Sequence, residues 1–254
     1  MAYKKGRPLL DDSCFFRLAS FLFFHGVWPI CFTMINMLYS TKILNKRYLN
    51  RFKQGIIVSN HTTFLDPISM SSLVRPRRLF HTLLEETVTV PFLGTLTRLL
   101  GGIPVPKGGR DSIEQLIKVI QLAMKRRRFV HIYPEGECFI YNQNVKEFLR
   151  GAFLIAARLN VPVIPVATIM SEGRFKPYSF FGRSRPKQTL SILPAVYPQT
   201  FDCITSDGKI NVHGIKMFAK EVQDRIQAEI DSKNGSSAFY KGQMERIKGI
   251  NDVK

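Results

Sequence analysis

Short apolar runs alternate with longer stretches of helical periodicity along most of the chain. Runs rich in β-branched residues are typical of buried strands, and apolar residues three and four positions apart are typical of helices that bury one face. On this basis, strands are expected at residues 55–59, 129–132, 161–168 and 189–193. Helices are expected to begin at Asp66-Pro67 and to cover residues 111–128, 145–159 and 212–230. Strands alternating with helices predict an α/β fold in which helices cover a mostly parallel central sheet.

Local signals refine three of these elements. Asp66 is expected to cap the helix that has Pro67 at its first position, and Asp111-Ser112 with Glu114 and Gln115 forms a capping-box pattern. Prolines in the VPVIPVAT run at 161–168 predict an irregular strand, because proline cannot donate to a strand ladder.

The most apolar stretch of the chain covers residues 15–38 and is rich in aromatic residues. Its length is near the roughly 20 residues that span a bilayer. Pro29 is expected to kink or break a helix here, and basic residues flank both ends. Bases on both sides suggest that both ends stay on one face of a membrane, as in a bent, re-entrant or interfacial helix pair. A buried core helix is the alternative, and a cleaved signal peptide is disfavoured because no small-residue cleavage site follows.

These patterns divide the chain into three parts. We expect an N-terminal membrane-associated helical segment at 1–50, an α/β domain at 51–232, and a polar C-terminal tail at 233–254. A chain of 254 residues is long enough for one such domain with a small appendage.

Composition narrows the class of protein. Hydrophobic residues make up 45% of the chain and the mean hydropathy is −0.03, which excludes both a disordered chain and a polytopic membrane protein. The four cysteines lie far apart, so no zinc or disulfide framework is expected and a reduced, cytoplasmic setting fits. The net charge of 37 − 19 = +18 points to an anionic partner: nucleic acid, anionic lipid or a phosphorylated substrate. No nucleic-acid-binding module is recognisable, so nucleic acid is not the expected partner.

The first candidate for chemistry follows the strand at 55–59. His61 lies at the mouth of this strand and Asp66 lies five residues further on. A carboxylate that accepts a hydrogen bond from one imidazole nitrogen leaves the other nitrogen free to take a proton. The alternative is a helix-capping Asp beside an ordinary loop His. His131, in a predicted core strand, is expected to be a structural, hydrogen-bonded histidine.

Two further segments have the composition of ligand-binding loops. The glycine-rich run at 101–110 contains Lys107 and Arg110 and precedes a helix, a combination that suits a phosphate group. The run Tyr133-Pro134-Glu135-Gly136-Glu137-Cys138 follows a strand and holds a carboxylate where α/β sheets place ligands. A basic surface loop and an ordinary turn are the respective alternatives.

These features occur in the order, and at the spacing, of blocks in a known family. The N-H-x4-D pattern (Asn60, His61, Asp66), the glycine-rich turn at 102–110, the Pro-Glu-Gly turn and the V-P-V-I-P-V strand at 161–166 follow one another. Over about residues 55–170 the sequence resembles the glycerolipid acyltransferase family that contains the 1-acylglycerol-3-phosphate acyltransferases. The step Arg150-Gly151 before the last block also fits.

The resemblance implies a mechanism and a set of site residues. His61 would be the general base and Asp66 its orienting partner, and the acyl group would pass from acyl-CoA or acyl carrier protein to lysophosphatidate at the cytoplasmic face of a membrane. No metal, other cofactor or covalent acyl-enzyme is implied. The residues expected to bind substrate are Asn60, Lys107, Arg110, Glu135, Gly136 and Arg150.

Cys138 departs from the family pattern, which usually has an arginine there to contact the acceptor phosphate. Either Arg150, Lys107 or Arg110 compensates, or the acceptor is another lyso-lipid. A nucleophilic Cys138 partnered by His61 and a non-catalytic basic protein that binds membrane or nucleic acid are the remaining alternatives.

Overall fold

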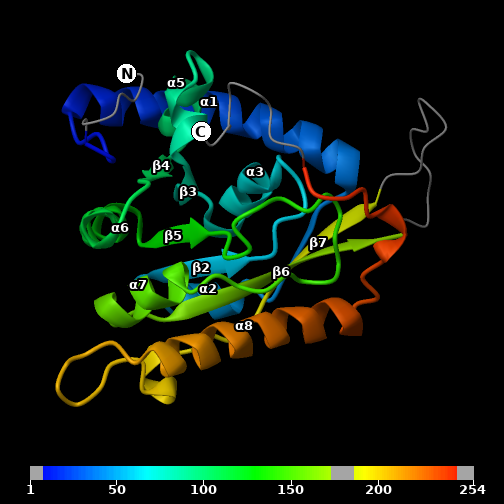
Figure 1. Cartoon of the computed structure of the whole chain (residues 1–254). Helices are drawn as coiled ribbons and strands as arrows, with labels where there is room; N and C mark the ends of the chain where they lie inside the picture. The colour runs from blue at the N-terminus through cyan, green and yellow to red at the C-terminus, as the bar shows by residue number, and fades with distance from the viewer. Residues whose placement is uncertain (1–7, 173–185, 245–254) are drawn as a thin grey trace.

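A single mostly parallel sheet organises the molecule. The computed structural model describes residues 8–172 and 186–244, and over these residues seven strands pair in the order β1-β7-β6-β2-β5-β3-β4 (Figure 1). All neighbouring pairs are parallel except β6 and β7. The predicted fold class is therefore confirmed. The strands are β1 (Lys42–Leu44), β2 (Gly55–Ser59), β3 (Phe80–Leu84), β4 (Gly102–Val105), β5 (Phe129–Ile132), β6 (Val163–Ser171) and β7 (Lys187–Ile192).

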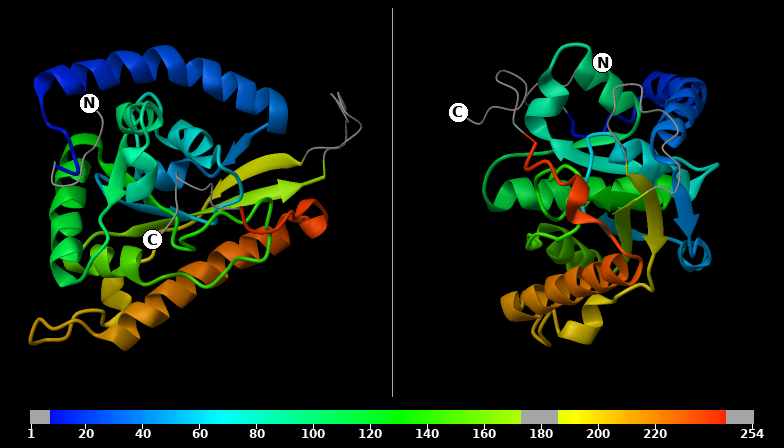
Figure 2. Two further views of the ribbon diagram at one scale, coloured as in Figure 1. Left: turned by 45° about the horizontal axis from the view of Figure 1, so that its top comes forward. Right: turned by 90° about the vertical axis from the view of Figure 1, so that its right-hand side faces the viewer.

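Helices cover both faces of the sheet (Figures 1 and 2). The α-helices are α1 (Cys14–Tyr39), α2 (Arg47–Asn50), α3 (Asp66–Ser71), α4 (Glu85–Thr89), α5 (Leu93–Leu99), α6 (Arg110–Arg127), α7 (Gly151–Leu159) and α8 (Val212–Ser232). Short 3₁₀ turns are η1 (Ser72–Val74), η2 (Pro198–Phe201) and η3 (Ser237–Phe239). Helices α6, α7 and α8 share one apolar core with the sheet, and α3 with η1 belongs to a second core on the opposite face.

Strand β2 contributes to both cores, and all five of its residues are buried. Side chains of a strand alternate between faces. Ile56 and Val58 accordingly belong to the core beneath α6, α7 and α8, whereas Ile57 belongs to the core that contains α3. The residue that follows this strand is therefore held at the carboxyl edge of a fully buried element.

Helix α1 is one continuous helix, so the predicted helix pair broken at Pro29 is wrong. Its 26 residues run through Pro29, and Ser13 caps its start by accepting the Phe16 N–H. Tertiary contacts support the helix beside the proline, which removes one bond: Trp28 is buried and its Nε1–H donates to the Ile68 carbonyl of α3. By length and composition alone α1 could cross a membrane, and 22% of its most apolar window is buried.

The predicted helix at 145–159 begins only at Gly151. Residues 145–150 stay outside the helix because side chains from elsewhere bind their amides. The Val145 and Phe148 N–H groups donate to Gln227 Oε1 and Gln223 Oε1 of α8, and the Lys146 N–H donates to Glu135 Oε1. The two partners in α8 lie far away in the sequence, so local periodicity could not reveal them.

Two other local predictions are also wrong. Strand β6 is regular and central despite Pro165, because this residue lacks only a donor and its carbonyl still accepts the Leu193 N–H. The capping box at 111–114 does not form: Gly109 occupies the N-cap of α6 without a side-chain bond, and Ser112 Oγ donates to the Lys107 carbonyl.

The described part of the predicted polar tail is paired with the rest of the molecule. Ile140 N–H donates to the Gly242 carbonyl, Lys241 N–H to the Ile140 carbonyl, and Met244 N–H to the Cys138 carbonyl. The remaining tail residues, 245–254, and the basic flank within residues 1–7 lie outside the described residues.

The core under α8 depends on one aromatic side chain. Phe218 is fully buried and its ring packs against Phe153 and Phe201, with ring centroids 5.2 Å away in each case. We expect Phe218→Ala to lower the free energy of unfolding by about 3–5 kcal/mol in urea titrations, because it leaves a cavity. The matched control is Met217→Ala, whose side chain is 46% exposed and whose effect should stay within about 0.5 kcal/mol. Equal losses in the two variants would contradict this packing.

Candidate active site

The candidate site begins where β2 ends. Asn60 anchors the loop after β2 to β6, because its Nδ2–H donates to the Thr168 carbonyl at 2.9 Å and its Oδ1 accepts the Thr168 N–H at 2.8 Å. This pair of bonds places His61 at the carboxyl edge of the sheet. Asn60 was predicted to bind substrate, and the structure shows it buried in this supporting contact.

His61 and Asp66 are hydrogen-bonded as their spacing predicts. His61 Nδ1 lies 3.1 Å from Asp66 Oδ2, the carboxylate is fully buried, and the imidazole is 18% exposed. The prediction that Asp66 caps α3 is wrong, because Leu65 occupies the N-cap position. Its carboxylate turns back onto the preceding loop instead.

The Asp66 carboxylate collects donors from that loop. Its Oδ2 accepts the backbone N–H groups of Thr62 and Thr63 at 2.7 and 2.8 Å, and its Oδ1 accepts Thr63 Oγ1 at 2.8 Å. Two backbone donors identify Oδ2 as an acceptor, so we assign the proton of the neutral imidazole to Nδ1. Among the described residues no hydrogen bond is made to His61 Nε2, which is the nitrogen left to take a proton.

Tyr133 forms the floor beneath the imidazole. The two rings stack with centroids 3.8 Å apart and an interplanar angle of 15°, which fixes the plane of His61. The Tyr133 hydroxyl is buried and has no hydrogen-bond partner among the described residues. Burial, together with Asp66 and Cys138, raises the pKa of Tyr133 well above its usual range, so the hydroxyl keeps its proton.

A chain of buried hydrogen bonds lies behind Tyr133. His131 Nε2 is 3.0 Å from Ser59 Oγ, and His131 Nδ1 is 3.2 Å from His81 Nδ1. The other nitrogen of His81, Nε2, is 3.0 Å from Ser71 Oγ. Burial lowers the pKa of His81 to about 3 and that of His131 well below its usual range. Both rings are therefore neutral near pH 7, and the prediction of a hydrogen-bonded core histidine at 131 is confirmed.

Glu135 joins two loops. Its Oε2 accepts the His61 N–H at 2.8 Å and its Oε1 accepts the Lys146 N–H at 2.9 Å. Burial raises its pKa to about 7, and the two backbone bonds oppose this shift. Glu135 was predicted to contact substrate, and in the structure its carboxylate holds the backbone of His61. Gly136 follows with φ of +74°, a left-handed conformation that favours glycine.

Of the predicted phosphate ligands, Lys107 is the one that the sheet order places away from His61. Lys107 follows β4, pairs with Glu86, and is separated from β2 by three strand steps, about 14 Å. The first half of the glycine-rich run is strand β4 itself. Arg150 is exposed at the N-cap of α7, and the side chain of Arg110 lies outside the described residues.

Cys138 is buried beside the carboxylates of this site. Burial, followed by Asp66, Glu135 and Glu137, raises the pKa of its thiol far above the usual range. A thiol held neutral in this way is a poor nucleophile, which counts against a cysteine–histidine mechanism. In residues 8–172 and 186–244 no group of three or more His, Cys, Asp or Glu side chains could hold a metal ion.

The class of protein follows from a match to a family model. The Acyltransferase model matches residues 40–169, which contain β1 to β5, α7, most of β6 and the His61–Asp66 pair. The chain belongs to this family.

Individual relatives agree with that assignment. The chain is 27% identical over 177 residues to the 1-acyl-sn-glycerol-3-phosphate acyltransferase of Saccharomyces cerevisiae, an alignment that covers 68% of this chain and 54% of that protein. It is 30% identical over 123 residues to the chloroplastic enzyme BAT2 of Brassica napus, which bears the same activity name, covering 48% of this chain and 34% of that one. The chain thus spans between a third and about half the length of these two relatives.

A solved structure shares the fold. The crystal structure of the 1-acyl-sn-glycerophosphate acyltransferase PlsC from Thermotoga maritima superposes with a TM-score of 0.55 at 17% identity, over 88% of this chain and 81% of that one.

The buried Glu135 makes folding stability depend on pH. Its carboxyl titrates near 4.5 when unfolded and near 7 when folded, so between these values the folded protein binds more protons. Stability should therefore fall as the pH rises through this window, by on the order of 3 kcal/mol from this group. Glu135→Gln should flatten the dependence in urea titrations from pH 4.5 to 7.5, whereas exposed Glu147→Gln should keep it. Parallel curves for wild type and Glu135→Gln would show that this carboxyl is not the cause.

Proposed function

We propose that this protein is an O-acyltransferase that moves a fatty acyl group from acyl-CoA or acyl carrier protein to the free hydroxyl of lysophosphatidate, giving phosphatidate. The observation that carries the proposal is the His61–Asp66 pair, with one imidazole nitrogen bound to a buried carboxylate and the other without a partner among the described residues. Family membership and the names of the aligned relatives support the reaction class.

The geometry suits general-base catalysis. Nε2 of His61 takes the proton of the acceptor hydroxyl as its oxygen attacks the thioester carbonyl. Asp66 accepts from Nδ1 throughout and stabilises the imidazolium that forms. Collapse of the tetrahedral intermediate breaks the C–S bond, and the thiolate leaves with the proton from Nε2. The products are an ester and a thiol, and His61 returns to its neutral form.

The identity of the acceptor turns on position 138. Cys138 stands where the related pattern usually has arginine, and its side chain is buried. Recognition of the acceptor phosphate then falls to other cations, for which the exposed Arg150 at the N-cap of α7 is our candidate because α7 follows the Glu135-braced loop. Another lyso-lipid acceptor is the alternative that this substitution favours.

Membrane association is part of the proposal. Helix α1 buries Phe16, Phe24 and Trp28 along one side. Large apolar residues elsewhere on the helix are exposed, among them Phe15, Leu18, Phe21, Leu22, Ile30, Met34 and Met37. A face of this size is typical of a membrane-contacting surface, and we place it on the cytoplasmic leaflet, where the excess of basic residues meets anionic headgroups.

Loss of the general base is the direct test of the chemistry. We expect His61→Ala to lower acyl transfer about 10²–10⁴-fold in detergent micelles, because proton removal then falls to water. The matched control is His213→Ala on the exposed start of α8, which should keep wild-type activity.

Each preparation is assayed with acyl-CoA and acyl-loaded carrier protein as donors, against lysophosphatidate and neutral or zwitterionic lyso-lipids. A folded His61→Ala protein with near-full transfer would refute the mechanism. Transfer to other lyso-lipids in preference to lysophosphatidate would refute the proposed acceptor while leaving the mechanism intact.

The exposed face of α1 is tested by vesicle flotation. Each buried leucine contributes roughly 1.5–3 kcal/mol, so Leu18→Ser with Leu22→Ser should reduce binding to lipid vesicles more than tenfold. Val212→Ser with Met217→Ser, at exposed positions of α8, is the control and should float like wild type. Unchanged flotation of the α1 variant would argue against this membrane surface.

A further inference from the structure

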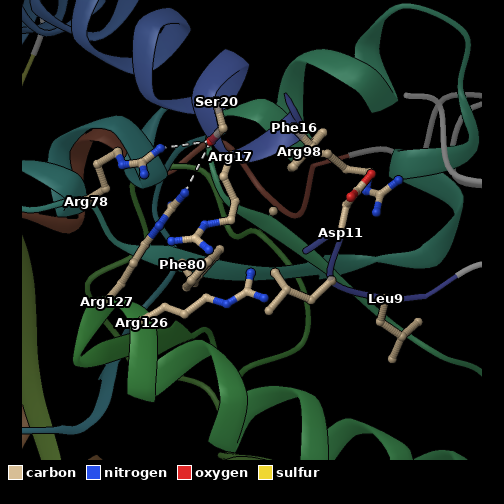
Figure 3. Close-up of a pocket in the computed structure, with 12 residues that line it drawn as sticks. Leu9, Asp11, Phe16, Arg17, Ser20, Arg78, Phe80, Arg98, Arg126 and Arg127 are labelled. Carbon is tan, nitrogen blue, oxygen red and sulfur yellow. Dashed lines mark hydrogen bonds between the residues drawn. The ribbon is translucent and has the colours of Figure 1, made fainter. Parts of the chain in front are cut away.

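A second polar pocket lies beneath the first half of α1, away from His61. The cavity has a volume of about 90 Å³ and is lined by residues 9–11, the first half of α1, the start of β3 with Arg78 before it, α5, the start of β4 and the end of α6 (Figure 3). Five arginines line it: Arg17, Arg78, Arg98, Arg126 and Arg127. They come from four separate parts of the chain, so the fold assembles a cluster that no sequence motif announces.

This pocket lies at the amino ends of the parallel strands, whereas the candidate active site lies at their carboxyl ends. Arg127 precedes the first residue of β5, whereas Tyr133 follows its last residue. A strand of four residues measures about 13 Å, and β2, which leads to His61, runs parallel to β5. The arginine pocket therefore cannot contact a small group bound at His61.

Acidic side chains compensate only part of the charge. Asp11 is the one carboxylate that lines the cavity among the described residues, and Arg126 pairs with Asp12 just outside it. Two of the guanidinium groups meet at a neutral oxygen instead: Arg78 Nη1 and Arg127 Nη2 donate to Ser20 Oγ at 3.0 and 3.2 Å, as Figure 3 shows. Burial and neighbouring arginines lower the pKa of both side chains, as expected where positive charge lacks a counterion.

Aromatic rings hold three of the guanidinium groups in place. Arg78 lies over Phe21, Arg98 over Phe16 and Arg127 over Phe80, with distances to the ring centroids of 5.4, 5.6 and 3.8 Å. Such contacts orient a guanidinium without neutralising it. The donors are thus pre-positioned around the cavity while a net positive charge remains.

We propose that this pocket binds a phosphate group. Planar guanidinium forks match phosphate oxygens, and a pre-formed, positively charged cavity of this size favours a compact oxyanion. The same half of α1 exposes Leu18, Phe21 and Leu22, so a phospholipid whose acyl chains lie along that face could place its headgroup phosphate in the pocket. A lipid headgroup is therefore the favoured source, and free phosphate is distinguished from it by experiment.

The test uses the full chain, purified in detergent, and two probes. In the first, inorganic phosphate is titrated and the melting temperature is followed. In the second, binding is measured to vesicles of phosphatidylcholine with and without phosphatidylglycerol. The pocket variant is Arg17→Gln with Arg78→Gln, and Arg17→Gln alone serves as a second variant because this side chain is exposed. The control removes the same charge elsewhere, through Arg158→Gln and Arg225→Gln, which break exposed ion pairs with Glu114 and Glu221.

We expect the double pocket variant to lose at least fivefold more affinity for anionic vesicles than the control does. Arg17→Lys with Arg78→Lys should not restore the loss, because lysine keeps the charge but not the fork. Stabilisation by inorganic phosphate that the pocket variants lack would identify a site that also takes free phosphate; a pocket-dependent effect on vesicles alone would identify a lipid headgroup site. Equal losses in pocket and control variants, full rescue by lysine, or no pocket-dependent effect of either probe would overturn the proposal.

Discussion

The buried carboxylate of Asp66 is the interaction on which the site depends. A carboxylate without solvent must find several donors, and this one accepts from two backbone amides, the hydroxyls of Thr62 and Thr63, the Gln188 side-chain amide and the His61 imidazole. The amide bonds force the loop of residues 61–65 to curl around the carboxylate, and that curl turns His61 Nδ1 toward it. Loop conformation, ring orientation and the assignment of the basic nitrogen therefore share one cause. Tyr133 from below and Glu135 from behind complete the restraint on His61.

The parts of the molecule that could be predicted are those with local causes. Strands β2 and β5 and the long helix α8 follow from apolar periodicity, and the His61–Asp66 bond follows from a spacing that a single loop must close. The predictions for the start of α7 and for the continuity of α1 are wrong, because contacts with other elements decide these features. Residues 145–150 stay outside α7 because Gln223, Gln227 and Glu135 bind amides among them, and α1 stays whole across Pro29, where Trp28 is bonded to α3.

The same reasoning explains which site features could not be foreseen. Glu135 was expected from the sequence to bind substrate, and its contact with the His61 backbone appears only when β5 and β2 lie side by side. Tyr133 becomes the floor of His61 for the same reason. The arginine pocket draws on residues from 17 to 127, each of which resembles an ordinary surface charge until the fold brings them together.

Helix α1 is hydrogen-bonded to the elements that carry the His61–Asp66 pair. Trp28 is bonded to the Ile68 carbonyl in α3, the helix that begins with Asp66, and the Tyr39 hydroxyl is bonded to the Tyr141 hydroxyl, 2.9 Å away, in the loop whose backbone contacts Thr62. These two hydrogen bonds restrain the position of α1 relative to the His61 ring. Under the proposed function, with α1 lying in a bilayer surface, the imidazole would stand at one height above that surface and would reach only a lipid hydroxyl at the same level.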